Sequence, residues 1–157
     1  MTTSTSVTLL RNVSSGAPTQ ADFQVISTHA PSKESLEQDQ ILVRNLYLSC
    51  DPYMRGRLSA SKDSYVEPFV PGKPLNGLGV GIVEASTSSG FKEGDMVTGE
   101  AFKWESRFVT GTQGVTKIPA MAGASPAHYL GVLGMPSFTA YVGVVSLCKA
   151  QAGETIL

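Results

Sequence analysis

Residues 40–48 read QILVRNLYL, and this stretch is the most strongly β-prone of the chain. Branched and aromatic side chains dominate it, as is typical of strands. The polar stretch 32–39 precedes it, and Asp51-Pro52 follows it and ends the extended segment. The sequence therefore predicts a central strand over residues 40–48.

Further short strands are expected on both sides of this one. In residues 77–85 glycine alternates with larger residues, which indicates bends or a close approach of neighbouring backbone. Many short strands with Gly and Pro turns between them are typical of an antiparallel, barrel-like domain. We therefore predict a mainly β domain over residues 1–125. Its other strands are Val7–Leu10, Phe23–Ile26, Gly77–Ala85, Met96–Gly99, Trp104–Thr110 and Val115–Ile118.

Residues 126–157 have a different pattern. Ser125-Pro126 is typical of a helix start, with Ser as N-cap and Pro in the first turn. Gly134 is expected to end this short helix, and a second helix with a wide apolar face is expected over Ser137–Lys149. After a turn, Glu154–Leu157 is expected to begin a new strand. Strands followed by a helix and a new strand indicate a β domain that leads into a truncated βαβ domain.

Composition excludes several classes of function. The 157 residues suffice for one domain, and no run approaches the ~20 apolar residues of a membrane helix. The 12 basic and 13 acidic residues form no basic cluster, so nucleic acid is not an expected partner. Only 16% of the residues are charged, which indicates either a surface covered by another domain or a surface rich in Ser, Thr and Gly. Two distant cysteines and an N-terminus without signal-peptide features favour a cytoplasmic protein.

The corner after the central strand is a candidate site. Proline restricts Asp51 to extended conformations, so the chain presents Tyr53 on a rigid turn. A phenol there can donate a hydrogen bond into a cleft at neutral pH. The alternative is structural, with Tyr53 covering the end of the barrel and bonding a carbonyl group. Arg55 and Arg57, which follow, are expected on the solvated surface.

Three segments in order give a resemblance to a known family. They are NLYLSCDPYMR (45–55), PGKPLNGLGVGIVE (71–84) and YLGVLGMPSFTAYVG (129–143). Together they resemble the zinc-independent branch of the medium-chain dehydrogenase/reductase superfamily. Within it they are most similar to the plant-type NADPH-dependent alkenal/enone double-bond reductases, which are related to the leukotriene-dehydrogenase and prostaglandin-reductase group.

The resemblance implies a fold and an activity. The fold would be a GroES-like, partly open barrel in residues 1–125, followed by a helical linker and the first strand of a truncated Rossmann domain in residues 126–157. The complete protein would be a homodimer that uses NADPH to reduce the conjugated C=C bond of small α,β-unsaturated aldehydes or ketones. This chain alone would be inactive, because it has only one wall of the cofactor cleft. Its glycine-rich run at 77–81 lacks the spacing of a dinucleotide-binding turn and is interpreted as part of the barrel.

The resemblance also assigns candidate residues. Tyr53 would be the catalytic hydrogen-bond donor and would contact the substrate together with Leu78, which stands where a second Tyr is common in the family. That substitution implies a more apolar substrate pocket. The nicotinamide would contact Pro52, Gly134, Met135 and Thr139, although plain packing at the helix junction is the alternative for Met135 and Thr139.

No metal is expected. The zinc-binding branch places a Cys near position 50 and a His-Glu pair near position 77, where this chain has Asn76-Gly77-Leu78. A catalytic zinc needs about three protein ligands, so Cys50 is instead expected to be a buried core thiol. Two alternative functions stay open: quinone reduction on the same scaffold, or a non-catalytic truncated binding or interaction domain.

Overall fold

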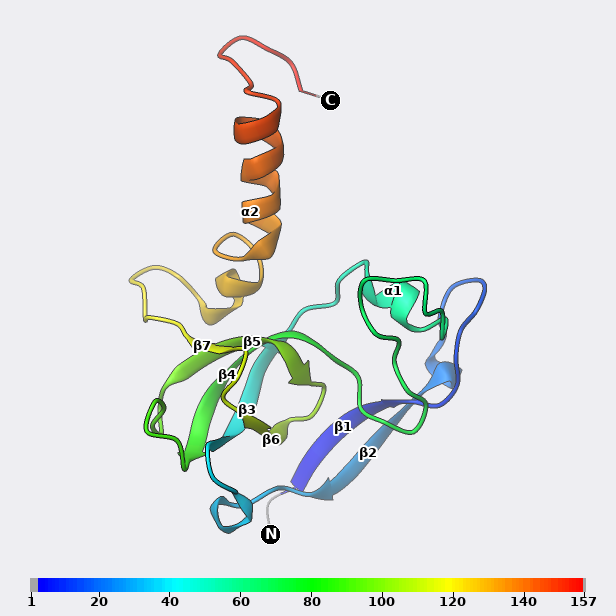
Figure 1. Ribbon diagram of the computed structural model, residues 1–157, viewed down its shortest axis with the longest axis vertical. Coiled ribbons are helices and arrows are strands. Elements are labelled where there is room, and N and C mark those ends of the chain that lie inside the picture. The colour runs from blue at the N-terminus through cyan, green and yellow to red at the C-terminus, as the bar shows by residue number, and fades with distance from the viewer. Residues whose placement is uncertain (1–2, 157) are drawn as a thin grey trace.

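The computed structural model describes residues 3–156, and it is built mainly of β-strands (Figure 1). Strands β1 (Thr3–Leu9) and β2 (Phe23–His29) form an antiparallel pair. The other strands form a sheet in the order β6-β3-β4-β5-β7. They are β3 (Gln40–Leu48), β4 (Asn76–Ser86), β5 (Met96–Lys103), β6 (Arg107–Gly111) and β7 (Val115–Lys117). Every strand expected within residues 1–125 is present, and β3 has the predicted bounds.

The two sheets are joined at one edge but do not close into a barrel. The backbone of Val7 in β1 donates to the carbonyl of Trp104 at 2.8 Å and accepts from Leu75 at 3.0 Å. Ser6 also forms an isolated antiparallel bridge with Glu105. The expected mainly β architecture with a partly open barrel is therefore confirmed.

Glycines in the central strands leave room for one aromatic ring. Gly79 of β4 is paired with Gly99 of β5. A Cβ atom on Gly79 would lie 2.7 Å from Phe102, and one on Gly99 would lie 2.6 Å from its ring. The ring of Phe102 is buried and meets Phe108 edge-on, with 5.1 Å between ring centroids. At Gly79 and Gly99 the close neighbour is thus an aromatic side chain and not the neighbouring backbone that the sequence predicted; at Gly81 it includes the Arg44 carbonyl oxygen.

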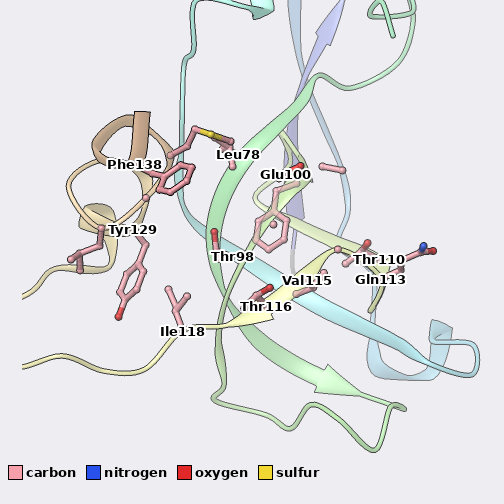
Figure 2. Close-up of a pocket in the computed structure, with 17 residues that line it drawn as sticks. Leu78, Thr98, Glu100, Thr110, Gln113, Val115, Thr116, Ile118, Tyr129 and Phe138 are labelled. Atoms are coloured by element: carbon pink, nitrogen blue, oxygen red, sulfur yellow. The ribbon is translucent and has the colours of Figure 1, made fainter. Parts of the chain in front are cut away.

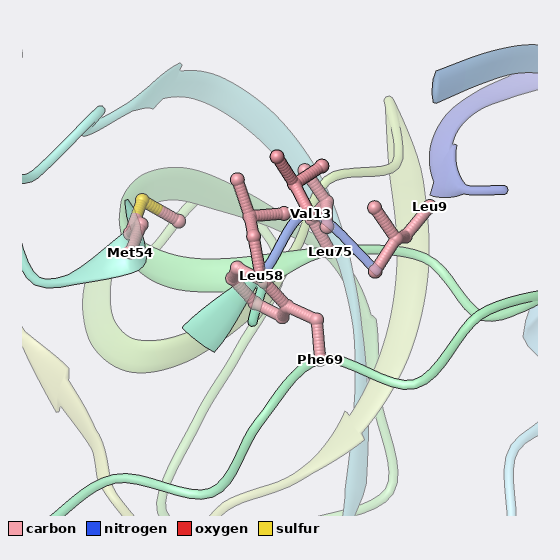
Figure 3. Packing of buried hydrophobic residues seen from close by; sticks show 6 residues of the cluster. All are labelled: Leu9, Val13, Met54, Leu58, Phe69 and Leu75. Carbon is pink, nitrogen blue, oxygen red and sulfur yellow. The ribbon is translucent and has the colours of Figure 1, made fainter. Parts of the chain in front are cut away.

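A second cluster of buried apolar side chains holds the short helix α1 (Met54–Arg57) in place (Figure 3). Met54 and Leu58 lie on the same side of this turn, since residues four apart share one face. The cluster consists of Leu9, Val13, Met54, Leu58, Phe69 and Leu75, with Tyr53 and Trp104 packed at its edge. It fixes the chain directly after Tyr53. The remaining short helices of the β region are η1 (Gln20–Asp22) and η2 (Lys33–Ser35).

The C-terminal segment is helical, as expected, but its helices differ from the prediction. Ser125 does cap a short 3-10 helix, η3 (Pro126–Leu130), by accepting from the Ala127 amide. The second helix begins two residues early as α2 (Met135–Tyr141) and continues as the wider π-helical η4 (Val142–Leu147). Valine and glycine are poor α-helix formers, which is consistent with the change at Val142. Lys149 lies outside the helix with a positive φ of 52°.

The expected last strand is not formed. Residues 154–156 have no regular secondary structure, and Leu157 lies outside the described residues. A strand needs a neighbour to pair its backbone groups, and Figure 1 shows this end of the chain far from both sheets. Within residues 3–156, no helix has the length and apolar character needed to span a bilayer.

The helical segment projects from the β-sheets and exposes apolar side chains (Figure 1). Phe138 is 66% exposed and Leu147 is 74% exposed. Burying apolar area stabilises by about 25 cal/mol per Å². We therefore expect the 157-residue chain, expressed alone, to associate through this segment and to scatter light with a molar mass above the 16.6 kDa of a monomer.

Charged substitutions test this expectation. The double variant Phe138→Lys/Leu147→Lys should shift the chain towards the monomer. Leu10→Lys is the control, because Leu10 is another exposed apolar residue but lies in the β region. This substitution should not shift the chain towards the monomer. A monomeric parent chain at all accessible concentrations would contradict the expectation.

Candidate functional site

The corner that follows β3 places Tyr53 at the wall of a cavity of about 800 Å³. Four parts of the chain supply the wall: the 51–57 corner, the 65–67 segment, the strands β4 and β5, and the start of α2. The lining residues are Asp51, Pro52, Tyr53, Arg57, Tyr65, Val66, Glu67, Asn76, Leu78, Glu100, Ala101, Met135 and Pro136. Residues far apart in the sequence therefore meet around one space.

Local hydrogen bonds hold the turn that carries Tyr53. The Ser49 hydroxyl donates to the Asp51 carboxylate at 2.7 Å, and the Met54 amide donates to the Asp51 carbonyl at 3.0 Å. Gly77 faces this corner, because a Cβ atom there would lie 2.9 Å from Cε of Met54 and 3.5 Å from the Tyr53 hydroxyl. The missing side chain at position 77 thus leaves room for the end of the Met54 side chain, and the Tyr53 hydroxyl lies at ordinary contact distance.

The surroundings of Tyr53 keep its phenol protonated. Partial burial is the main reason why the pKa of Tyr53 is raised above its ordinary value, and the negative charge of Asp51 adds to the increase. The positive charge of Arg57 opposes it. A phenol with a raised pKa is neutral at physiological pH, so Tyr53 is a hydrogen-bond donor there.

The expectation that Arg57 lies on the solvated surface is wrong. Its side chain is only 8% exposed, and its guanidinium lies 3.9 Å from the centre of the Phe69 ring. It donates to the carbonyl of Glu67 at 2.8 Å, to the carbonyl of Asn76 at 2.9 Å and to the Asn76 side chain at 2.8 Å. Arg57 therefore connects α1, the 65–69 segment and the start of β4.

Arg55 likewise binds backbone and not an acidic partner. Its guanidinium donates to the carbonyl of Val13 at 3.0 Å and to the carbonyl of Gly16 at 2.6 Å. Arginine offers five N–H donors in a planar fork, which suits it to bridging separate backbone segments. Arg55 thus braces the loop before β2 against α1.

A second cavity of about 850 Å³, shown in Figure 2, shares lining residues with the first. Its wall includes β5, β7 and the start of the helical segment, and Figure 2 shows Leu78, Tyr129 and Phe138 at its edge. Leu78 and Met135 line both cavities. Both therefore lie at the boundary between the two spaces.

The structure brings together most of the site residues predicted from the sequence. Pro52, Tyr53, Leu78 and Met135 share the first cavity, and Gly134 lines the second. Thr139 is exposed on α2 and lines neither of these cavities. Sequence reasoning did not select Arg57, Tyr65 and Asn76 as members of the site.

Gly134 opens the second helix and does not end the first. The first helix ends at Leu130, and Gly134 is the N-cap of α2. A Cβ atom at this position would collide with the carbonyl oxygen of Tyr129. The junction between η3 and α2 therefore requires glycine, and this requirement also places Met135 at the cavity.

Cys50 is not the buried thiol that was expected. It is a free, exposed cysteine, because β3 ends at Leu48 and the chain leaves the sheet before Cys50. Cys148 is also free and exposed. Across residues 3–156, no three His, Cys, Asp or Glu side chains gather closely enough to share a metal ion.

A protein-family model described as the N-terminal domain of oxidoreductase matches residues 7–118. The chain belongs to this oxidoreductase family. The NADP(+)-dependent 2-alkenal reductase of Nicotiana tabacum is 38% identical over 148 residues, which cover 94% of this chain and 43% of the relative. The NADPH-dependent curcumin reductase of Escherichia coli is 34% identical over 142 residues, 90% of this chain and 39% of the relative.

The fold of this family member also matches a solved structure. CurA from Vibrio vulnificus in complex with NADPH superposes with a TM-score of 0.79 and 30% identity, over 96% of this chain and 42% of that protein. The GroES-like fold class and the resemblance to the alkenal/enone group of medium-chain reductases are thereby confirmed. The chain spans about two fifths of the length of these relatives.

Proposed function

We propose that the complete protein uses NADPH to reduce the conjugated C=C bond of small α,β-unsaturated aldehydes or ketones. The observation that carries the proposal is the protonated phenol of Tyr53 in a cavity that also contains Pro52, Leu78 and Met135. The similarity to the tobacco protein named 2-alkenal reductase supports this choice of substrate. We further propose that residues 1–125 bind the substrate and residues 126–157 lead into the cofactor-binding part.

The residues of the cavity fit one end of the cofactor. Pro52, Met135 and Pro136 offer an apolar wall, and Met135 is 53% exposed, so a flat nicotinamide ring can pack there. A pyrophosphate needs free N–H donors or cations, whereas Arg57, the cationic residue of this wall, is engaged by Glu67 and Asn76. The wall of this cavity therefore fits the nicotinamide end and offers no free cation for a phosphate.

Each chain residue then has a defined part. NADPH supplies the hydride that reduces the substrate. Tyr53 donates a hydrogen bond to the substrate carbonyl oxygen, which gains negative charge during the reaction, and a donor aimed at such charge lowers the barrier. Leu78 packs on the apolar part of the substrate. Gly134 sets the position of Met135. The hydroxyl of Thr139, which is exposed outside the cavity, contacts the part of the cofactor that carries the carboxamide.

A substrate panel on the complete protein tests the proposal. With NADPH present, a short 2-alkenal and a conjugated ketone should be consumed and should give the saturated carbonyl compound. The matching saturated aldehyde is the control and should not be consumed, because it has no conjugated bond. Turnover of quinones without turnover of the 2-alkenal would favour quinone reduction and reject the proposal.

A further inference from the structure

The substrate cavity contains a second phenol that the sequence did not reveal. Position 78, on the β4 side of the cavity, carries the apolar Leu78, so this strand offers no hydroxyl group there. Tyr65 lines the same cavity from the segment between α1 and β4. Its side chain is 89% exposed, so no protein group holds it in the interior. The phenol is thus available to a molecule that enters the cavity.

The backbone near Tyr65 is anchored although its side chain is exposed. Arg57 donates to the carbonyl of Glu67 at 2.8 Å, and the amide of Phe69 donates to the carbonyl of Arg57 at 2.8 Å. Phe69 is buried in the second cluster beneath the guanidinium. Tyr65 therefore lies two residues before Glu67, whose carbonyl is held by Arg57. This anchor keeps the Tyr65 ring near the cavity, although the exposed ring can still rotate.

The two phenols face the same space. Partial burial is the main reason why the pKa of Tyr53 is raised; the charge of Asp51 adds to the increase, Arg57 opposes it, and a Tyr65 phenolate, which forms only at high pH, makes the smallest contribution. The other acidic groups of the wall, Glu67 and Glu100, are exposed. Tyr53 and Tyr65 both line the cavity of about 800 Å³, so both phenols can reach a molecule that enters it.

We propose that Tyr65 is a second substrate-contacting residue, whose hydroxyl donates a hydrogen bond to the same carbonyl oxygen as Tyr53. This inference rests on the proposed function and extends it. Two donors that converge on one oxygen stabilise its developing charge better than one.

The test compares tyrosine variants of the complete protein. Tyr65→Phe removes only the hydroxyl, and we expect it to lower kcat/KM for a conjugated ketone about five- to ten-fold, since one donor to developing charge is removed. Tyr47→Phe is the matched control, because Tyr47 is also an exposed tyrosine but lines neither cavity. It should leave kcat/KM unchanged. Because Tyr65 is exposed, its substitution should not affect folding.

A binding measurement gives a readout that does not depend on turnover. In protein labelled with ¹³C at the tyrosine ζ carbons, the Tyr65 signal is identified by its loss in Tyr65→Phe. A saturated ketone, added as an unreactive ligand, should shift this signal and leave that of Tyr47 in place. If Tyr53→Phe impairs the enzyme while Tyr65→Phe matches the parent and its signal does not shift, the inference is wrong and the proposed function stands. If no conjugated carbonyl compound is reduced, the proposed function itself fails.

Discussion

Replacing Tyr53 by phenylalanine in the complete protein is expected to lower kcat for a conjugated ketone about ten-fold or more, because a single hydrogen-bond donor to developing charge can be worth a few kcal/mol. The substitution keeps the ring, so the packing of Tyr53 at the edge of the second cluster is preserved. Only the hydroxyl that faces Gly77 is removed. The loss therefore measures the hydrogen bond and not the shape of the cavity.

The pH dependence of the parent protein supplies a second check on Tyr53. An ordinary phenol has a pKa near ~10, and burial and Asp51 raise the pKa of Tyr53 above its ordinary value. The neutral, donating form is present below the pKa and is lost only as the pH rises through it. The Tyr53 contribution should therefore stay constant from neutral pH to the ordinary phenol range. Unchanged kcat and KM in Tyr53→Phe would mean that Tyr53 is only structural.

The strands and the Tyr53 corner could be predicted because their signals are local. Branched residues, alternating glycines and Asp51-Pro52 act on the chain within a few positions, and β3 accordingly has the predicted bounds. The meeting of Tyr53, Leu78 and Met135 required the family resemblance, because no local pattern brings segments so distant in sequence together. The roles assigned to these residues stay predictions.

Arg57 and Tyr65 were missed because their surroundings depend on tertiary contacts. A charged residue in a four-residue helical turn is usually solvated. Arg57 is buried only because the 65–69 segment folds back and supplies both the Phe69 ring and the Glu67 carbonyl. Tyr65 lies in a stretch of polar residues without periodicity, so no sequence signal connected it with the cavity.

Cys50 and the C-terminal helices show the opposite error, in which a local pattern was extended too far. The strand that ends at Leu48 was expected to keep Cys50 in the core, but the chain turns away first. The apolar pattern of residues 137–149 predicted one helix with a wide apolar face, but the helix ends at Leu147. In the described chain this face is exposed, because the sheets do not cover it. A hydrophobic pattern thus predicts an amphipathic element but not what packs against it.

The largest effect on stability is expected at Gly81, in the buried part of β4. This residue pairs with Asn45 of β3, beside an irregularity in the register of the two strands. A Cβ atom on Gly81 would lie 2.7 Å from the carbonyl oxygen of Arg44 and 2.5 Å from Cγ1 of Val43. The backbone oxygen cannot move aside without separating the two central strands.

We therefore expect Gly81→Val to lower the free energy of unfolding by about 3 kcal/mol or more, at the upper end of the cost of overpacking a core. That is a large share of the ~5–15 kcal/mol that stabilises a typical domain. Urea unfolding, followed by the fluorescence of the single tryptophan, Trp104, measures the change at low protein concentration.

Gly111→Val is the matched control for this prediction. Gly111 ends the edge strand β6, and no atom lies within 4 Å of the position that its Cβ would occupy. Valine favours strands more than glycine does, so this variant should be as stable as the parent or slightly more stable. If the Arg44 carbonyl excludes a side chain from position 81, replacing glycine by valine should lower the free energy of unfolding in β4 but not in β6. Equal unfolding midpoints for the two variants would show instead that β3 and β4 separate at little cost.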